Sequence, residues 1–355
     1  MKDNLNRKIL PQGFYDTLFP EAMQALECNV KALKTIEKFG YQLVDPCFME
    51  FEEQNLSAFG AKNYKVTDSL SDRMMVIRED ITPQIIRLVR DNYFDLNFAE
   101  KPLRISYSGD VFKKKGKGKY KERQITQTGF EIISNKKSQY DVEVIYMAWE
   151  VLENLGLSKD SITFDFNIPN LLDQYFEKNS FSEDDRVRIE RNIDDKNFSA
   201  LCSDEVASEI NEIIKIYDKA DDVESAIKVL DEISGIIDFD SIKYLKEIFE
   251  NLAKELPEIK LSFNLFEKMD FSYHNDVCYT VISSKTLEEV GRGGRYVVKS
   301  VDKNADAVGF TFNMNSLLRV AEKAQGVLKV ESAGYNQGLR QLKELREKGL
   351  VTVYE

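Results

Sequence analysis

The chain contains a single histidine, His274, among its 355 residues. Any Ser-His-Asp or Cys-His catalytic arrangement would have to use this one residue. Its neighbours, Tyr273, Asn275 and Asp276, are typical of a turn or a strand end rather than of a proton relay. We therefore expect His274 to be a loop or surface residue without a catalytic role.

Cysteines and long apolar runs are also scarce. No two of the four cysteines have the spacing of metal ligands, which predicts free thiols in a reducing compartment and no metal site; they are Cys28, Cys47, Cys202 and Cys278. No apolar stretch approaches the ~20 residues that span a bilayer. The first ten residues are polar and charged and lack an apolar signal-peptide region. These absences predict a cytoplasmic protein.

Acidic residues outnumber basic ones by 61 to 49, which gives a net charge of −12. This balance disfavours a protein whose whole surface binds nucleic acid, because phosphate binding requires clustered lysine and arginine. The sign reverses locally between Lys113 and Arg123, where six lysines and one arginine surround two glycines. A solvated turn and a phosphate-attracting patch explain this run equally well, and Lys113 and Arg123 are its candidate anion contacts.

The order of the expected elements favours an α+β fold. Periodicity predicts helices over 21–39, 82–92, 141–155 and 317–324, and strands over 41–46, 73–78, 103–112, 123–133, 162–168, 259–266 and 277–283. Gly40 is a stop signal for the first helix. Residues 113–121 are expected to be a glycine-containing turn of an antiparallel hairpin, and residues 170–256 a helical insertion between strands.

Two segments carry polar side chains at suggestive spacing. Asp80 and Thr82 stand where a strand meets a helix, and the simplest interpretation is that they cap that helix. In the returning strand of the hairpin, Gln127, Gly129 and Glu131 alternate and therefore share one face. Such a face could hold a small ligand with an amine or imidazole group, although an exposed polar strand face is the simpler alternative.

A late glycine run, residues 291–296, has neither the lysine of a phosphate-binding loop nor the spacing of a dinucleotide fingerprint. We therefore expect no nucleotide-binding loop at this position and no cofactor.

Taken in order, these segments resemble the class II aminoacyl-tRNA synthetase core, and in particular its histidyl branch. The similarity covers roughly residues 10–324. Its first motif begins at Pro11-Gln12-Gly13-Phe14-Tyr15-Asp16, its second spans Tyr107 to Glu131, and its third is approached through Gly293-Gly294-Arg295-Tyr296 and Ala307-Val308-Gly309-Phe310. The resemblance implies an antiparallel sheet flanked by helices within a core of residues 1–326, and a homodimer formed through the first motif.

Three departures from the family pattern concern arginines. Lys113 stands where the second motif supplies an arginine to the ATP α-phosphate, and Ser316 stands where the third motif supplies another. The family's histidine-specific arginine is also missing, because residues 268–273 contain none. Serine has neither the charge nor the reach of arginine. The comparison implies a protein that no longer forms aminoacyl-adenylate.

The side-chain pocket of the family is retained in part. The resemblance places the histidine-binding role on Asp80, Thr82, Gln127, Glu131 and Tyr273. The remaining residues, 327–355, are expected to form a strand, a helix and a strand, too short for an anticodon-binding domain. No tRNA partner is therefore expected.

A retained side-chain pocket, missing phosphate-binding arginines and a short C-terminal segment together resemble the regulatory subunits of ATP phosphoribosyltransferase. This enzyme catalyses the first step of histidine biosynthesis. The resemblance implies a hetero-oligomer with a short-form catalytic subunit and feedback inhibition by free histidine. A divergent histidyl-tRNA synthetase without its anticodon-binding domain remains the alternative, and a synthetase-like protein that binds another partner is a third.

Overall fold

The chain consists of two compact units, Met1–Ala321 and Glu322–Glu355, which are described separately. The structure is a computed structural model. It describes residues 10–54, 63–93, 97–98, 100–117, 121–135, 137–266, 274–299, 303–321, 330–333 and 351–354.

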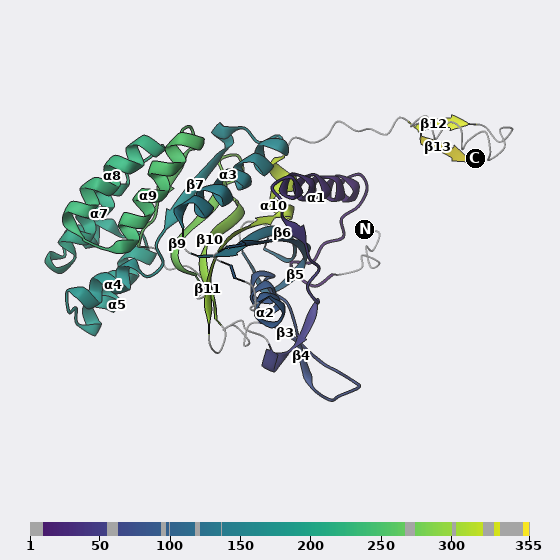
Figure 1. The fold of residues 1–355 in the computed structure, drawn as a ribbon, viewed down its shortest axis with the longest axis horizontal. Helices are drawn as coiled ribbons and strands as arrows, with labels where there is room; N and C mark the ends of the chain where they lie inside the picture. Colours follow the sequence, from purple (N-terminus) through teal and green to yellow (C-terminus); the bar gives the residue numbers. More distant parts are fainter. Residues whose placement is uncertain are drawn as a thin grey trace, which may run out of the picture. The chain divides into compact units, whose positions relative to one another are not determined.

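An eight-stranded sheet forms the centre of the first unit (Figure 1). Neighbouring strands run antiparallel except for two parallel pairs near the edges, β1 with β5 and β7 with β8. In spatial order the strands are β1 (Gln42–Leu43), β5 (Leu103–Lys117), β6 (Glu122–Ser134), β11 (Asn304–Asn313), β10 (Glu289–Lys299), β9 (His274–Ser283), β7 (Ile162–Asn167) and β8 (Leu261–Phe263). The expected α+β class is confirmed, although the sheet is mixed rather than wholly antiparallel.

Helices cover both faces of this sheet, and each face has its own apolar core. On one face lie α1 (Glu21–Lys38), α3 (Ser138–Asn154) and α10 (Met314–Val320), packed on alternate residues such as Phe130, Phe310 and Phe312. On the other face α2 (Thr82–Asn92) packs with residues such as Tyr107 and Tyr296. Since neighbouring strand residues point to opposite faces, β6, β10 and β11 serve both cores.

A block of helices follows β7 and returns to the sheet at β8. It comprises α4 (Leu171–Lys178), α5 (Glu183–Asp194), α6 (Phe198–Cys202), α7 (Ser208–Tyr217), α8 (Val223–Ile236) and α9 (Asp240–Glu255), with a short 3-10 turn at Glu205–Ala207. The block adjoins the rest of the unit through α9, which packs against α3. Its helices are drawn in teal and green in Figure 1.

Two smaller sheets complete the described structure. In the first unit β2 (Met49–Phe51), β4 (Met74–Ile77) and β3 (Tyr64–Thr67) form an antiparallel sheet. In the second unit β12 (Val330–Ala333) and β13 (Val351–Tyr354) pair in parallel. The helix expected near the end, at 337–348, lies outside the described residues. No helix in the described part of the chain has the length and apolarity needed to cross a membrane.

The basic stretch after Phe112 is not the long turn that its glycines and lysines suggested. Strand β5 continues as far as Lys117, which pairs with Glu122 of β6 after a register shift. The turn prediction is therefore wrong for residues 113–117. The stop at Gly40 is confirmed, since this residue has φ +82°, a conformation that glycine adopts without strain.

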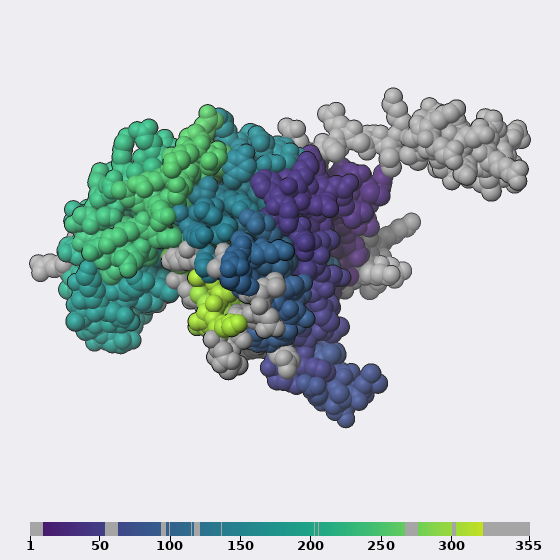
Figure 2. Space-filling view, in the orientation of Figure 1, coloured from purple at the N-terminus to yellow at the C-terminus, as the bar shows by residue number. Residues whose placement is uncertain are grey.

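Helix α1 buries only part of its apolar surface. Ala32 and Ile36 lie in the core, whereas the side chains of Met23, Leu26 and Val30 are 52%, 57% and 42% exposed. The helix, purple in the space-filling view, lies at the surface of the first unit (Figure 2). An apolar stripe on an exposed helix of this length is unusual for a surface that stays in water.

Candidate functional site

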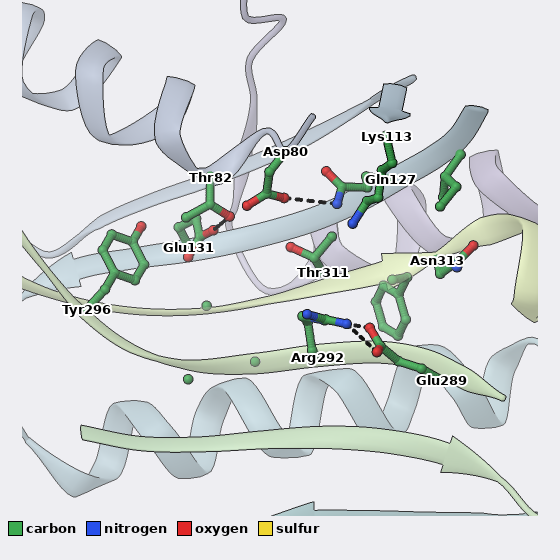
Figure 3. A pocket seen from close by; sticks show the side chains of 15 residues that line it. Asp80, Thr82, Lys113, Gln127, Glu131, Glu289, Arg292, Tyr296, Thr311 and Asn313 are labelled. Atoms are coloured by element: carbon green, nitrogen blue, oxygen red, sulfur yellow. Dashed lines mark hydrogen bonds and ion pairs between the residues drawn. The ribbon is translucent and has the colours of Figure 1, made fainter. Parts of the chain in front are cut away.

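A small polar cavity of ≈ 50 Å³ lies between the start of α2 and strands β6, β10 and β11 (Figure 3). Segments separated by more than 200 residues in sequence supply its lining. The lining residues are Asp80, Thr82, Lys113, Ile125, Gln127, Glu131, Glu289, Arg292, Gly293, Gly294, Tyr296, Gly309, Thr311, Phe312 and Asn313. Four of the five residues expected to bind histidine therefore lie at one cavity. The fifth, Tyr273, lies outside the described residues.

Strand register explains how a carboxylate can reach the interior of this sheet. Glu131 of β6 lies opposite Gly309 of β11, which in turn lies opposite Gly294 of β10. A Cβ atom on Gly309 would stand 1.6 Å from Oε2 of Glu131. The missing side chains thus leave room for the Glu131 carboxylate on the face that carries α2.

Glu131 is the most deeply buried acidic group of the cavity, with 2% of its surface exposed. Its Oε1 accepts hydrogen bonds from the hydroxyl groups of Thr82 (3.1 Å) and Tyr107 (3.2 Å). Burial raises its pKa from 4.5 to about 8, and the negative charge of Asp80 adds to the rise, whereas the hydroxyl groups of Thr82, Tyr296 and Tyr107 oppose it. A cation or N–H donor beside Glu131 would favour its charged form.

Asp80 and Gln127 form a second polar pair. Gln127 donates from Nε2 to Oδ1 of Asp80 at 2.9 Å, and its Oε1 accepts from the backbone N–H of Ile81 at 3.1 Å. The N-cap residue of α2 is Ile81, whose side chain makes no capping hydrogen bond. The capping interpretation of Asp80 and Thr82 is therefore wrong: both side chains turn away from the helix end toward β6 (Figure 3).

The other charged residues that line the cavity are two cations, Lys113 and Arg292, and one carboxylate, Glu289. Arg292 of β10 donates from Nε to Oε1 of Glu289 at 2.5 Å, and from Nη2 to Oε2 of the same carboxylate. Lys113 reaches the cavity from β5 (Figure 3). Burial lowers the pKa of Lys113, and the positive charge of Arg292 lowers it further, against the charges of Asp80, Glu289 and Glu79.

Arg123, the second expected anion contact, is not among the lining residues. Its guanidinium donates to the backbone carbonyls of Lys113 (3.2 Å) and Gln12 (3.2 Å) and lies over the ring of Phe14. Its backbone N–H also binds the carbonyl of Gly13. Arg123 thus holds the segment before α1 against the hairpin.

Ser316 lies in the first turn of α10, where its backbone N–H binds the side chain of Asn313. The nearby arginine, Arg319, donates to Glu288 at 3.0 Å and to Glu122 at 3.0 Å. Two carboxylates therefore surround its guanidinium. Arg319 also donates to Oγ of Ser316 at 3.1 Å, and it does not line the cavity.

Sequence reasoning missed several lining residues, including Arg292, Tyr296 and Thr311. All three lie on strands that follow the helical block, and they meet Glu131 only through strand pairing. Tyr296 lies within the Gly-Gly-Arg-Tyr segment, and that segment was the sequence signal for this part of the cavity. Within the described residues, no group of His, Cys, Asp and Glu side chains could hold a metal ion.

Comparison with known proteins gives a consistent result. The model of the histidyl-tRNA synthetase family matches residues 13–317. An ATP phosphoribosyltransferase regulatory subunit from Gluconobacter oxydans is 31% identical over 327 residues, which are 88% of this chain and 81% of the relative. A protein of the same name from Rhodospirillum centenum is 27% identical, with 97% of this chain and 88% of the relative covered.

Solved structures show the same fold. A Bacillus halodurans protein described as an ATP phosphoribosyltransferase regulatory subunit/histidyl-tRNA synthetase superposes with a TM-score of 0.79 at 19% identity, covering 98% of this chain and 92% of that chain. A histidyl-tRNA synthetase from Nostoc sp. superposes with a TM-score of 0.71 at 17% identity, covering 98% and 86%. The expected class II synthetase-like fold is confirmed.

Proposed function

Because the chain belongs to the histidyl-tRNA synthetase family and, within it, to the ATP phosphoribosyltransferase regulatory subunits, we propose that it binds free histidine in the cavity beside α2. Histidine binding then inhibits a separate catalytic subunit, and the chain itself forms no aminoacyl-adenylate.

The environment of Glu131 is the observation that carries this proposal. A carboxylate buried inside a sheet is unfavourable unless it is neutralised or paired. Thr82 and Tyr107 bind Oε1, and Oε2 faces the gap left by Gly309. A ligand that brings an imidazole N–H or an ammonium group to Oε2 would form a charge-assisted hydrogen bond, which is among the strong ones in a buried site.

Asp80 adds a carboxylate acceptor at the same end of the cavity, where Gln127 donates to it and Thr82 donates to Glu131. A ligand with two separated nitrogen groups fits this arrangement better than a simple amine. Histidine has an ammonium and an imidazole group. The name of the relatives, ATP phosphoribosyltransferase regulatory subunit, connects the chain to the pathway that makes this amino acid. These features support histidine as the ligand.

The lack of adenylate chemistry rests on the phosphate-binding positions. Adenylate formation requires cations that stabilise the developing charge on the α-phosphate. Ser316 offers a hydroxyl at one such position, and the adjacent Arg319 is bound to Glu288 and Glu122. Lys113 provides one cation at the other position, without the bidentate geometry of arginine. Two strong phosphate contacts are therefore replaced by weaker ones.

Feedback regulation requires a catalytic subunit as partner and an assembly through which histidine binding affects that subunit. The exposed stripe of Met23, Leu26 and Val30 on α1 supports a homodimer within a hetero-oligomer with the catalytic subunit. Histidine inhibits if it binds one state of that assembly more tightly than another, and a coupling of about 1–3 kcal/mol is typical.

The proposal is tested by combining binding with activity. Isothermal titration should show histidine binding to the isolated chain. A short catalytic subunit should transfer phosphoribosyl groups faster when the chain is added, and histidine should reverse this gain. Failure of the isolated chain to bind histidine, together with full inhibition of the complex, would place the sensor on the catalytic subunit or on the interface instead.

A further inference from the structure

The cavity has two ends of opposite charge. The acceptor groups of Glu131 and Asp80 lie near the start of α2. Lys113 and Arg292 contribute two cations to the lining of the same cavity (Figure 3). One carboxylate, Glu289, accompanies the cations. A free amino acid has the complementary distribution, since its positive ammonium and its negative carboxylate are attached to the same carbon.

We propose that Arg292, assisted by Lys113, binds the α-carboxylate of the amino-acid ligand, and that Arg292 leaves Glu289 in order to do so. This inference rests on the proposed function, because it concerns the same ligand and the same cavity. It gives a specific binding role to a residue outside the acceptor cluster around Asp80 and Glu131.

The repulsion between the two cations supports an anion at this end. Burial and the charge of Arg292 both lower the pKa of Lys113. A carboxylate placed between the two side chains would remove that repulsion. Arginine is suited to this role because its planar fork donates two parallel hydrogen bonds to a carboxylate. Arg292 already makes this type of contact, with Glu289 as the carboxylate.

The size of the cavity indicates that a side chain must move. Its volume of ≈ 50 Å³ is far below the ~150 Å³ of an engineered cavity that holds benzene. Arg292 is long and flexible, and its ion pair with Glu289 is partly accessible to solvent, with side-chain exposures of 19% and 34%. An exchange of Glu289 for a ligand carboxylate would replace one carboxylate partner of Arg292 by another, so the charge-assisted contacts of its guanidinium would be kept.

The inference is tested with two ligands that differ only at the carboxyl group. L-Histidine and L-histidinol share the amine and the imidazole, but histidinol has an alcohol in place of the carboxylate. Calorimetry should show that the wild-type chain prefers histidine. In Arg292→Gln, histidine affinity should fall by about 10- to 100-fold, the range expected when a hydrogen bond to a charged group is lost. Histidinol affinity should change by less than about threefold.

Two further variants sharpen the result. Glu289→Gln removes the carboxylate that competes for Arg292, so this variant should bind histidine more tightly than the wild type. Arg104→Gln is the matched control, because Arg104 makes the same two-bond pair with Glu143, at 2.9 and 2.7 Å, outside the cavity. It should leave both affinities unchanged. Thermal unfolding of each variant verifies that it folds.

The possible outcomes separate the two proposals. No histidine binding by the wild type overturns the proposed function and this inference together. Histidine binding with the same histidine-to-histidinol ratio in wild type and Arg292→Gln overturns the inference alone. A third arm uses ATP and inorganic phosphate as probes: if Arg292→Gln weakens either one more than histidine, the cationic end binds phosphate and the carboxylate assignment is wrong.

Discussion

Gly309 lies directly opposite Glu131 across strands β11 and β6, and a Cβ atom at residue 309 would stand 1.6 Å from the Glu131 Oε2 atom. The glycine is therefore part of the proposed binding site even though it has no side chain. It makes the space into which the carboxylate extends, and no rotation of a larger residue could restore that space, because β-carbon positions are fixed by the backbone.

We expect Gly309→Ala to abolish histidine binding. The added methyl group must displace the Glu131 carboxylate from its contacts with Thr82 and Tyr107, and overpacking of a filled interior typically costs about 1–3 kcal/mol. Calorimetry and thermal unfolding would measure the two effects. Gly235→Ala is the control: it lies in helix α8 with no atom within 4 Å of its Cβ position, so alanine there should be neutral or stabilising.

The raised pKa of Glu131 makes the stability of the ligand-free protein depend on pH. In the folded chain this group titrates at about 8 instead of 4.5, so the folded state holds a proton that the unfolded state releases between these values. Stability therefore decreases as pH rises through that window. Glu131→Gln keeps the neutral shape at every pH and should be more stable than the wild type by about 1–4 kcal/mol at pH 9.

Thermal unfolding of both proteins between pH 5 and pH 9 measures this difference. Asp141 and Asp165 also have raised pKa values because of burial, so the wild-type curve alone would not isolate Glu131. The difference between wild type and Glu131→Gln does. Parallel curves across the range would show that Glu131 is ionised in the folded protein at all these pH values.

Alternation along one strand made two of the lining residues predictable from sequence. The period of two places Gln127 and Glu131 on one face wherever the strand lies, and both line the cavity. The local pattern around Asp80 and Thr82 did not predict where their side chains point, because a capping hydrogen bond and a bond to a distant strand use the same atoms; only the family resemblance placed them at the site. The structure shows Thr82 bound to Glu131, 49 residues further along the chain.

For the fold, as for the site, local sequence patterns predicted elements correctly, whereas pairing between distant strands left no sign in the sequence. Helix α2 begins and ends where its periodicity predicted, at Thr82 and Asn92. Strand β5 was predicted too short, because lysines and Gly116 are typical of turns and the pairing of Lys117 with Glu122 leaves no local signal. Arg292 was missed for a similar reason. The glycine-rich sequence around it is not typical of a strand, and β10 forms through its pairing with β9 and β11.

We expect the chain to form a homodimer through α1 in the absence of any partner. Sedimentation of the wild type at micromolar concentration should give the dimer mass. Leu26→Asp should give the monomer, because it places a charge in the exposed stripe between Met23 and Val30. The control is Val187→Asp, at a position in α5 that is 47% exposed. A monomeric wild type, or an equal effect of the two substitutions, would contradict the α1 interface.

The chain should show no histidine-dependent exchange between ATP and pyrophosphate. This reaction requires adenylate formation, and the family resemblance implies that Ser316 stands where a phosphate-binding arginine is needed. The assay should give the same background with and without histidine. A strong exchange signal that disappears in Asp80→Asn would instead identify the chain as a divergent histidyl-tRNA synthetase and overturn the regulatory proposal.

Glu131→Ala should separate activation of the catalytic subunit from inhibition by histidine. Loss of the carboxylate removes a charge-assisted hydrogen bond to the ligand, which contributes about 1.5–3 kcal/mol of binding free energy. Calorimetry of the isolated chain should record this loss. Glu131 lies inside the sheet and is only 2% exposed. The substitution therefore leaves the outer surface of the chain unchanged, and assembly with the catalytic subunit should persist.

The variant complex should therefore transfer phosphoribosyl groups at the wild-type rate and require more than about tenfold more histidine for half-inhibition. If wild-type and variant complexes were inhibited equally, histidine would act at the catalytic subunit or at the interface, and the cavity beside α2 would have no part in feedback.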